Sequence, residues 1–346
     1  MQNDGSRMIK VGIIGVSGYS GMLALELLLK HDDVRLTYVG AQNTQGRLDQ
    51  ICPRLKGKTD LHCDKFDLKK ALQAVDLFFL AVPHTASMPI TPKLLQAEKK
   101  VIDLSADYRL KSKQVYERWY EVKHTDTKNF SRAVYGLPEF YREDIKKASL
   151  VANPGCYPTA ALLALAPLVS TRTDSIQSII IDAKSGVSGA GRKVVSNLMF
   201  AEVNENFKAY KVLSHQHTPE INLYLSKMAG RSIKTTFVAH LLPINRGILE
   251  TIYVRMNEKV SESVLYDLYR KFYKTEKFVR VLPLGSQPEI KDVTATNYCD
   301  LGLVVSKDKN LIVITSVIDN LMKGAAGQAV QNMNLMCGFA EDKGLV

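Results

Sequence analysis

The sequence has few cysteines, and none of them is arranged as structural cysteines usually are. The five, Cys52, Cys63, Cys156, Cys299 and Cys337, are scattered, odd in number and contain no Cys-x-x-Cys pair. This pattern argues against a disulfide framework and against a cysteine-based zinc site. Because a single cysteine is by default a small buried apolar residue, at most one or two of the five need a chemical explanation.

Long hydrophobic runs are also missing. The longest candidates, such as LFFLAV from Leu77 to Val82, have the length of a strand and not of a membrane span. The first ten residues, MQNDGSRMIK, contain no signal-type apolar segment and no Arg/Ser-rich transit stretch. We therefore predict a cytoplasmic protein without a membrane partner, preceded by a short disordered extension at Met1 to Arg7.

Basic residues are in excess, but they are not concentrated. The formal net charge is +11, and the densest groups, such as KGK at 56–58, are short. A solvated, mildly basic surface explains this pattern better than a nucleic-acid site, which stays the alternative at this point. The positive electrostatic potential of such a surface favours the binding of small polyanionic ligands.

The order of predicted elements indicates two domains in the 346 residues. An apolar run at 9–14 is followed by a glycine turn and a helical run, and further strands are predicted at 34–40, 76–82 and 101–104. Strands that alternate with helices predict a Rossmann-like, doubly wound parallel sheet, in an N-terminal domain over residues 8–155.

The pattern changes after residue 156, where strand candidates outnumber helices. They lie at 175–184, 234–242, 247–256, 300–305 and 310–318. This excess of strands over helices predicts an α+β domain over 156–319 with a mixed, largely antiparallel sheet. One last helix is expected from Met322 to Met336.

A glycine triplet marks the first strand-to-helix turn. Gly15, Gly18 and Gly21 form GxxGxxG between a strand and a helix, the context in which such a loop binds a nucleotide phosphate. The end of the second strand lacks the carboxylate typical of NAD sites and has Thr44 and Arg47 nearby. We therefore predict NADP as the cofactor, the alternative being a polar surface loop.

One cysteine stands at a turn that precedes an apolar helix. The stretch NPGCYPTAALLAL (153–165) predicts a helix that begins near Tyr157 or Pro158, with Cys156 at its N-terminus. Partial positive charge there favours a thiolate, and backbone N–H groups could bind an oxyanion. Cys156 is therefore the candidate nucleophile.

Two histidines could exchange protons with this thiol. In SHQHTPEI (214–221), His215 and His217 precede a predicted helix with Thr218 as its cap and Pro219 at its first position. A strand-like segment would point both rings the same way. We predict no metal, because no third ligand follows at a suitable spacing.

These motifs belong to longer stretches that together resemble one known family. The chain resembles the N-acetyl-gamma-glutamyl-phosphate reductases, the arginine-biosynthesis family within the semialdehyde dehydrogenase superfamily. The stretches that carry the resemblance are GVSGYSG (15–21), FLAVPHTAS (79–87), VIDLSADYRL (101–110), YGLPE (135–139), LVANPGCYPTAALLALAPL (150–168), DAKSGVSGAGRK (182–193), HQHTPEIN (215–222), NRGILETIYV (245–254) and DNLMKGAAGQAVQNMN (319–334). Two departures are Gln216, where the family more often has arginine, and TATNY (294–298) in place of a serine-containing stretch.

The resemblance implies an activity and its partners. It implies NADPH-dependent reduction of N-acetyl-glutamyl 5-phosphate to the semialdehyde and inorganic phosphate, through a thioester on Cys156. Either His215 or His217 would transfer protons, and we also expect a homo-oligomer, a dimer or a tetramer.

The resemblance further implies roles for individual residues, and it returns the C-terminal segment 320–346 to the first domain. The implied substrate-binding residues are Ser105, Arg109, Asn153 and Glu220. The implied cofactor-binding residues are Gly15, Ser17, Gly18, Tyr19, Ser20, Gly21, Thr44, Arg47, Pro83, Ser188, Gly189 and Asn320.

Two other functions stay open on the sequence alone. One is a related semialdehyde dehydrogenase that acts on aspartyl phosphate or on a carrier-linked aminoadipyl phosphate. The other is a catalytically silent relative that binds a nucleotide or nucleic acid, although the presence of Cys156 with both histidines argues against silence.

Overall fold

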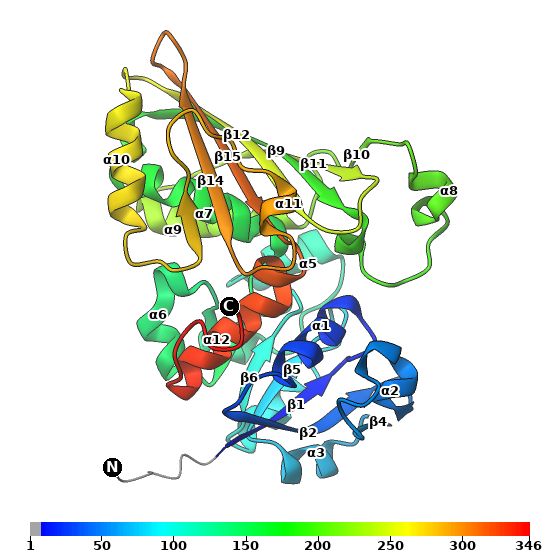
Figure 1. Cartoon of the computed structure of the whole chain (residues 1–346). Coiled ribbons are helices and arrows are strands. Elements are labelled where there is room, and N and C mark those ends of the chain that lie inside the picture. Colours follow the sequence, from blue (N-terminus) through cyan, green and yellow to red (C-terminus); the bar gives the residue numbers. More distant parts are fainter. Residues whose placement is uncertain (1–7) are drawn as a thin grey trace, which may run out of the picture. The chain divides into compact units, whose positions relative to one another are not determined.

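A computed structural model describes residues 8–346, which divide into two units (Figure 1). Unit 1 contains the chain up to Pro154 together with Ala325–Val346, and unit 2 contains Gly155–Gly324. The predicted extension at residues 1–7 lies outside the described residues. Within residues 8–346, no helix is long and apolar enough to cross a membrane.

Unit 1 is built on an eight-stranded sheet in the order β3-β4-β2-β1-β5-β6-β8-β7. Every pairing in this sheet is parallel except that of β3 with β4. The predicted parallel sheet is therefore confirmed. Its strands are β1 (Ile9–Ile14), β2 (Val34–Ala41), β3 (Gly46–Arg47), β4 (His62–Lys65), β5 (Leu77–Leu80), β6 (Lys100–Asp103), β7 (Ala133–Tyr135) and β8 (Leu150–Ala152).

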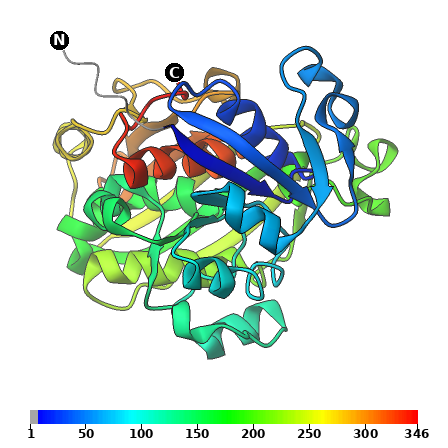
Figure 2. The ribbon, with the colours of Figure 1, turned by 90° about the horizontal axis from the view of Figure 1, so that it is seen from below.

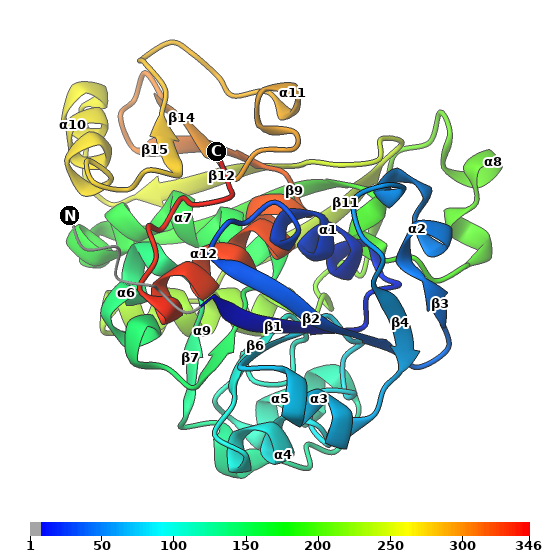
Figure 3. The same cartoon turned by 60° about the horizontal axis from the view of Figure 1, so that its bottom comes forward.

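Helices cover both faces of this sheet, as a doubly wound fold requires. Figure 3 shows α1 and α12 on one face and α3 and α4 on the other. Although α12 is near the end of the chain, it packs beside α1 (Figure 2). The helices of unit 1 are α1 (Tyr19–Leu28), α2 (Leu48–Ile51), α3 (Leu68–Ala74), α4 (Thr91–Gln96), α5 (Lys113–Tyr120), α6 (Pro138–Lys147) and α12 (Gly327–Cys337).

The parallel order brings four loops to one edge of the sheet. Because β1, β5, β6 and β8 are parallel neighbours, their carboxyl ends lie side by side. These ends lead into the glycine loop, the Ala81–Ser87 segment, the Ser105–Arg109 turn and the Asn153–Cys156 turn. This is the edge at which parallel α/β sheets bind ligands.

Unit 2 contains a seven-stranded sheet in the order β10-β11-β9-β12-β15-β14-β13. Four pairings are antiparallel, and two, β11 with β9 and β13 with β14, are parallel. The predicted mixed sheet is therefore confirmed. Its strands are β9 (Ile176–Gly186), β10 (Lys208–Tyr210), β11 (Thr236–Leu242), β12 (Ile248–Met256), β13 (Val279–Val281), β14 (Cys299–Val305) and β15 (Leu311–Ile318).

The longest helix of unit 2, α7 (Cys156–Thr171), packs against this sheet and is apolar on all sides. Its residues from Tyr157 to Val169 are buried, which explains why its sequence shows no polar stripe. It contacts β12 and β15 on one side and α9 (His217–Ala229) on another. The remaining helices of unit 2 are α8 (Phe200–Val203), α10 (Glu262–Phe272) and α11 (Ile290–Val293).

The C-terminal helix differs from the one predicted at Met322 to Met336. Its first part, Met322–Ala326, is a π-helix, and the α-helix proper begins at Gly327. The Gly324 N–H donates to the carbonyl oxygen of Asp319, five residues back, at 3.0 Å, which is the spacing of a π-helical bond. Periodicity alone does not reveal such a local widening.

Candidate active site

The candidate nucleophile opens the central helix of unit 2. Cys156 is the first residue of α7 and is half-buried, with Gly155 as the N-cap. The helix thus begins earlier than the predicted start at Tyr157 or Pro158. Pro158 is tolerated at the third position because N–H groups of the first turn have no partner within the helix. The thiol therefore lies at the electropositive end of a sixteen-residue helix.

A buried carboxylate holds the start of this helix. The Gly155 N–H donates to Oε1 of Glu220 at 2.9 Å, and Glu220 is 1% exposed. Glu220 lies in the first turn of α9, which packs along α7. The sequence resemblance gave Glu220 a substrate-binding role, whereas in the structure this oxygen binds backbone beside Cys156. Glu220 therefore fixes where the nucleophile stands.

A glycine packs directly on the nucleophile from the other side. A Cβ placed on Gly324 would lie 2.8 Å from Cβ of Cys156 and 3.3 Å from its Cα. No side chain fits this contact without displacing the cysteine. The π-helical turn Met322–Ala326 brings the backbone of Gly324 to this point.

The two histidines lie together, but not in the way that the sequence predicted. Helix α9 begins at His217, so Thr218 is its second residue and not its cap, and His215 lies in a turn and not in a strand. The His217 N–H donates to Nδ1 of His215 at 3.1 Å. This turn, and not strand geometry, places the two ring centroids 4.9 Å apart.

Both imidazoles pack on the residue that follows the nucleophile. The ring centroids of His215 and His217 are 5.5 and 5.8 Å from that of Tyr157. The structure therefore gathers Cys156, His215 and His217 around one tyrosine. Among the described residues, no group of three or more His, Cys, Asp or Glu side chains could hold a metal ion.

The surroundings of His215 keep its ring neutral. Burial, and then the charge of Lys211, lower the pKa of His215 to about 4. Its Nδ1 accepts the hydrogen bond from His217, so the ring proton must lie on Nε2. At neutral pH, His215 is consequently a hydrogen-bond donor and a weak base.

Two tyrosine hydroxyls complete this part of unit 2, and sequence reasoning missed both. The hydroxyl oxygens of Tyr157 and Tyr210 are 3.0 Å apart, and the Tyr157 O–H also donates to the carbonyl of His240 at 3.4 Å. Burial raises the pKa of Tyr210 to about 12. The only signal for Tyr157 was its place beside Cys156, and Tyr210 has no motif that would have identified it.

The glycine loop of unit 1 has the shape of a phosphate-binding turn. A Cβ on Gly15, whose φ is +95°, would lie 2.3 Å from the carbonyl oxygen of Ala81, and one on Gly21 would lie 2.4 Å from that of Gly15. Gly18 is different, because a Cβ there meets no atom closer than 3.8 Å. Packing thus requires Gly15 and Gly21, while Gly18 leaves open the approach to the first turn of α1.

The other predicted cofactor residues of unit 1 border this loop or its neighbouring strand. Ser17 lies within the loop, and Tyr19 and Ser20 begin α1, where N–H groups have no partner within the helix. Pro83 comes two residues after Ala81, whose carbonyl packs on the loop. These residues fit the pyrophosphate of a dinucleotide bound at a helix N-terminus.

The loop expected to attract a 2′-phosphate is less positive than its sequence indicates. Arg47 makes a two-pronged hydrogen bond with Asp49, with distances of 3.0 and 2.8 Å, and a further contact of 3.2 Å with Asp60. The end of β2 itself has no carboxylate, as the sequence indicates, but α2 and the loop before β4 bring Asp49 and Asp60 to Arg47. The carbonyl of Thr44, in the same loop, accepts from the Cys63 thiol at 3.2 Å.

Three predicted cofactor residues of unit 2 lie side by side. The Asn320 Nδ2 donates to the Ser188 hydroxyl at 3.0 Å, and Asn320 Oδ1 accepts from the Gly247 N–H at 2.7 Å. A Cβ on Gly189 would lie 2.9 Å from the Ser185 hydroxyl. Asn320 is therefore oriented by backbone and side-chain contacts on both sides of its amide.

The remaining predicted substrate residues meet at the carboxyl edge of the unit 1 sheet. Arg109 donates through Nε to the carbonyl of Asn153 at 2.7 Å and through Nη2 to that of Leu104 at 2.8 Å. The Asn153 amide donates to the Ala325 carbonyl and accepts from Asn332. Ser105 donates to Asp103 at 2.8 Å. These side chains hold the turn before Cys156 from within unit 1.

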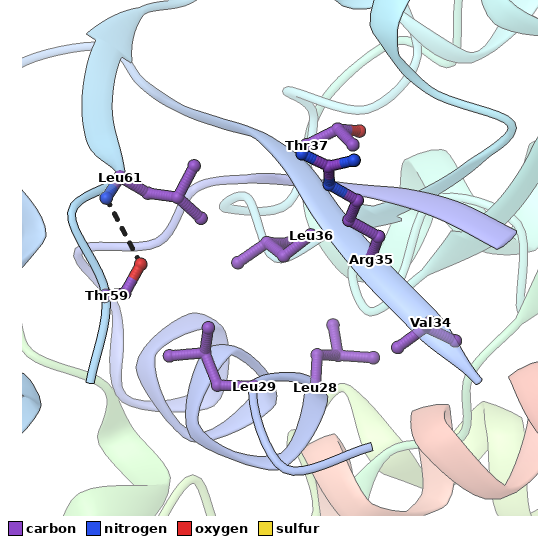
Figure 4. A pocket seen from close by; sticks show the side chains of 8 residues that line it. All are labelled: Leu28, Leu29, Val34, Arg35, Leu36, Thr37, Thr59 and Leu61. Atoms are coloured by element: carbon purple, nitrogen blue, oxygen red, sulfur yellow. Dashed lines mark hydrogen bonds between the residues drawn. The ribbon is translucent and has the colours of Figure 1, made fainter. Parts of the chain in front are cut away.

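A separate pocket of about 440 Å³ contains none of the predicted site residues (Figure 4). It lies between the last turn of α1, the first half of β2 and residues 59–61. The glycine loop connects the carboxyl end of β1 to the first turn of α1, whereas the pocket borders the last turn of α1. This pocket is therefore not the phosphate-binding turn.

Comparison with known proteins identifies relatives over nearly the whole chain. A family described as "Semialdehyde dehydrogenase, NAD binding domain" matches residues 10–148, and "Semialdehyde dehydrogenase, dimerisation domain" matches residues 156–320. An N-acetyl-gamma-glutamyl-phosphate reductase of Desulfotalea psychrophila is 51% identical over 98% of both chains. One of Pelotomaculum thermopropionicum is 48% identical over 97% of both.

Solved structures show the same fold at much lower identity. An aspartate semialdehyde dehydrogenase II of Vibrio cholerae, solved with ASA, has a TM-score of 0.71 at 17% identity and covers 96% of this chain and 98% of its own. The enzyme of Candida albicans, solved with NADP, has a TM-score of 0.71 at 14% identity, covering 95% and 98%.

The five cysteines should differ sharply in reactivity. Burial raises the pKa of both Cys63 and Cys337 to about 11, and Cys52 and Cys299 are buried. We predict that iodoacetamide at pH 7.5 modifies one thiol in a fast phase, measured by intact mass, and that peptide mapping places it at Cys156.

A Cys156→Ser variant should lose this fast phase, while a Cys337→Ser variant should keep it. A fast phase that survives in Cys156→Ser would show that Cys156 is not the activated thiol.

Proposed function

Since the chain belongs to the N-acetyl-gamma-glutamyl-phosphate reductase family of semialdehyde dehydrogenases, we propose that it reduces N-acetyl-L-glutamyl 5-phosphate to N-acetyl-L-glutamate 5-semialdehyde. Inorganic phosphate is the second product, NADPH is the reductant, and the reaction serves arginine biosynthesis. The observation that carries this proposal is Cys156 at the first position of α7, fixed by Glu220 and next to the tyrosine on which two imidazoles pack.

Cys156 performs the first chemical step. Its sulfur attacks the acyl carbon of the substrate, and the bond from that carbon to the phosphate oxygen breaks, which releases inorganic phosphate and leaves a thioester. The N-terminus of α7 favours the thiolate, and N–H groups of the first turn are oriented toward negative charge on the acyl oxygen. After reduction, the carbon–sulfur bond breaks and the semialdehyde departs.

The cofactor supplies the reducing equivalent: NADPH, when bound, donates a hydride to the acyl carbon. The glycine loop and the start of α1 would bind its pyrophosphate, as the open approach at Gly18 supports. Ser188, Gly189 and Asn320 would line the nicotinamide end. Thr44 and Arg47 would border the 2′-phosphate, with the charge of Arg47 reduced by Asp49.

The two histidines divide the proton chemistry. With its pKa near 4, His215 is a neutral imidazole at neutral pH and carries no second proton to transfer, but its Nε2–H can donate a hydrogen bond to a substrate oxygen. We therefore assign the acid–base role to His217, at the start of α9, and substrate positioning to His215.

Substrate binding in unit 1 centres on Arg109, and Ser105, whose hydroxyl is engaged by Asp103 and Ser87, supports the turn that carries it. Arginine suits carboxylate and phosphate groups because its donors form a planar fork. The contacts of Nε and Nη2 with two carbonyls fix the plane of this guanidinium at the carboxyl edge of the sheet. Asn153 contributes through the turn that it anchors and not through its amide, which is engaged within unit 1.

We also propose that the protein is a cytoplasmic homo-oligomer. The family description of residues 156–320 as a dimerisation domain supports self-association. In unit 2, residues that alternate with those facing α7 point away from it, and Ile180 and Val304 on that side are 43% and 39% exposed. The same side of β9 also bears Asp182 and Lys184, and a mixed face of this kind suits a second copy of the chain.

The two alternatives have less support. The aspartate semialdehyde dehydrogenases share the fold at only 14–17% identity, whereas relatives at 48–51% identity are named for the acetyl-glutamyl substrate. A silent relative would have no need for the arrangement around Cys156.

The activity can be tested in the reverse direction. With N-acetyl-glutamate semialdehyde, phosphate and NADP, we expect phosphate-dependent formation of NADPH, followed by absorbance. The kcat/KM should be higher with NADP than with NAD, and higher with this aldehyde than with aspartate semialdehyde. Faster turnover of aspartate semialdehyde would overturn the substrate assignment.

Replacement of the nucleophile is the control for this assay. Cys156→Ser should lose several orders of magnitude in turnover, because a hydroxyl is scarcely ionised at neutral pH. Its NADP affinity should be unchanged, since the glycine loop is intact.

The assignment of the histidines gives a separate prediction. Removing the acid–base group typically costs about 10²–10⁴-fold in rate, so His217→Asn should lower kcat by roughly that factor. His215→Asn should mainly raise the KM for the aldehyde. Kinetics that reverse this pattern would exchange the two roles, and loss of activity with a chelator, restored by zinc, would make the pair metal ligands.

A further inference from the structure

Beneath the Ser105–Arg109 turn, two buried carboxyl groups are joined by two hydroxyls. The Asp103 Oδ2 is 2.8 Å from the Ser105 hydroxyl and 3.1 Å from the Ser87 hydroxyl. Ser87 is also 3.0 Å from the Ser105 hydroxyl and 2.8 Å from Oδ2 of Asp107. All four residues are at most 1% exposed, so water does not complete this network.

Counting hydrogens shows that the network would be two protons short if both carboxyl groups were ionised. Its four oxygen–oxygen contacts each require a hydrogen, and the two hydroxyls supply only two. If Asp103 and Asp107 were both ionised, two close contacts would join lone pairs. A proton on Oδ2 of Asp103 supplies a third hydrogen and relieves part of this conflict.

The partners of Asp107 identify it as the ionised member. Its carboxylate accepts from the N–H groups of Thr85 and Ser87, at 2.8 and 3.3 Å, and from the hydroxyls of Ser87 and Tyr116, at 2.8 and 2.7 Å. Because all four of these groups donate to Asp107, a proton on its carboxyl group would have no acceptor among them. Asp103 accepts only one backbone hydrogen bond, from the Ser105 N–H.

The environment of Asp103 also favours its protonated form over that of Asp107. Burial, and then the charge of Asp107, raise the pKa of Asp103 to about 7, while Ser105 and Arg109 oppose the rise. The titratable or charged groups near the network are Asp107, Tyr108 and Arg109 on the same turn, Tyr116 on α5, His84 after β5, and His124 and Asp126 beyond Asp107 and Tyr108.

The network continues to the turn that precedes the nucleophile. Asp103 and Ser105 hold the first residues of the 105–109 turn, and Asp107 clamps it to the loop after β5. The turn ends at Arg109, which holds the carbonyl of Asn153 at 2.7 Å. Asn153 is three residues before Cys156 in the chain, so the network holds the last residues of unit 1 before the nucleophile.

We propose that Asp103 and Asp107 are positioning residues for the reduction. Asp103 is a carboxylic acid that accepts from the Ser105 hydroxyl and donates its one proton to the Ser87 hydroxyl, and Asp107 is the carboxylate to which Ser87 then donates. Their joint effect is to fix Arg109 and the Asn153–Cys156 turn. The kinetic part of this proposal rests on the proposed function, but the stability part does not.

Two isosteric variants separate the two protonation states. Asparagine imitates a protonated carboxyl group, because its NH₂ donates from the position of Oδ2 while its oxygen accepts from the Ser105 N–H. Asp103→Asn should therefore keep kcat/KM within about threefold of wild type at pH 6. Asp107→Asn replaces one of two oxygens, each of which accepts from two donors, with an NH₂ group, and should lower kcat/KM about tenfold or more. Asp103→Ala, which restores no hydrogen bond, should resemble Asp107→Asn.

The dependence on pH supplies the second measurement. The folded-state pKa of Asp103 lies above its unfolded value, so folding binds a proton, and the stability that this contributes falls as pH rises from about 4 to about 7. The melting temperature of wild type minus that of Asp103→Asn should therefore fall between pH 5 and pH 8. The kcat/KM of wild type, but not of Asp103→Asn, should decline above about pH 7.

The two readouts fail in different ways. A melting-temperature difference that does not change with pH, or equal damage from Asp103→Asn and Asp107→Asn at pH 6, would overturn the proposal. If the melting temperatures behave as expected but no variant turns over the acetyl-glutamyl aldehyde, the proposed substrate is wrong and the division of protonation states stands.

Discussion

The hydrogen bond from the Gly155 N–H to Glu220 is the contact on which the candidate active site of unit 2 depends. It joins the residue before Cys156 to the first turn of α9, the helix that begins at His217. Because both helices are buried against each other, this one bond sets the position of the thiol relative to the imidazoles. A carboxylate is a strong acceptor for a backbone N–H, and its burial leaves it no competing water.

The residue before Pro154, Asn153, is also held by a side chain. In unit 1, Arg109 binds the carbonyl of Asn153, and Asp103 and Asp107 hold the turn that carries Arg109. The backbone before the nucleophile is thus held at Asn153 by contacts within unit 1 and at Gly155 by a contact within unit 2. Catalysis by proximity requires such rigidity, since misplacement by about 1 Å can cost about 100-fold in rate.

Much of the fold could be predicted from the sequence, for physical reasons that also explain what could not. Alternation and glycine spacing gave the parallel and mixed sheets, because those patterns follow from which faces are buried. The short edge strands β3, β7 and β13 have too few residues for a pattern. The starts of α7 and α9, the two carboxylates on Arg47 and the inward use of Glu220 and Asn153 depend on contacts between distant segments, which no local spacing encodes.

The central claim is that Cys156, held by Glu220, carries the acyl group. The direct measurement is the intact mass of the enzyme incubated with N-acetyl-glutamate semialdehyde and NADP without phosphate, followed by peptide mapping. We predict an N-acetyl-glutamyl adduct on Cys156 that phosphate removes, formed more slowly in Glu220→Ala and absent in Cys156→Ser. An adduct on another residue, or NADPH formation with no acylated enzyme at any time, would contradict the account.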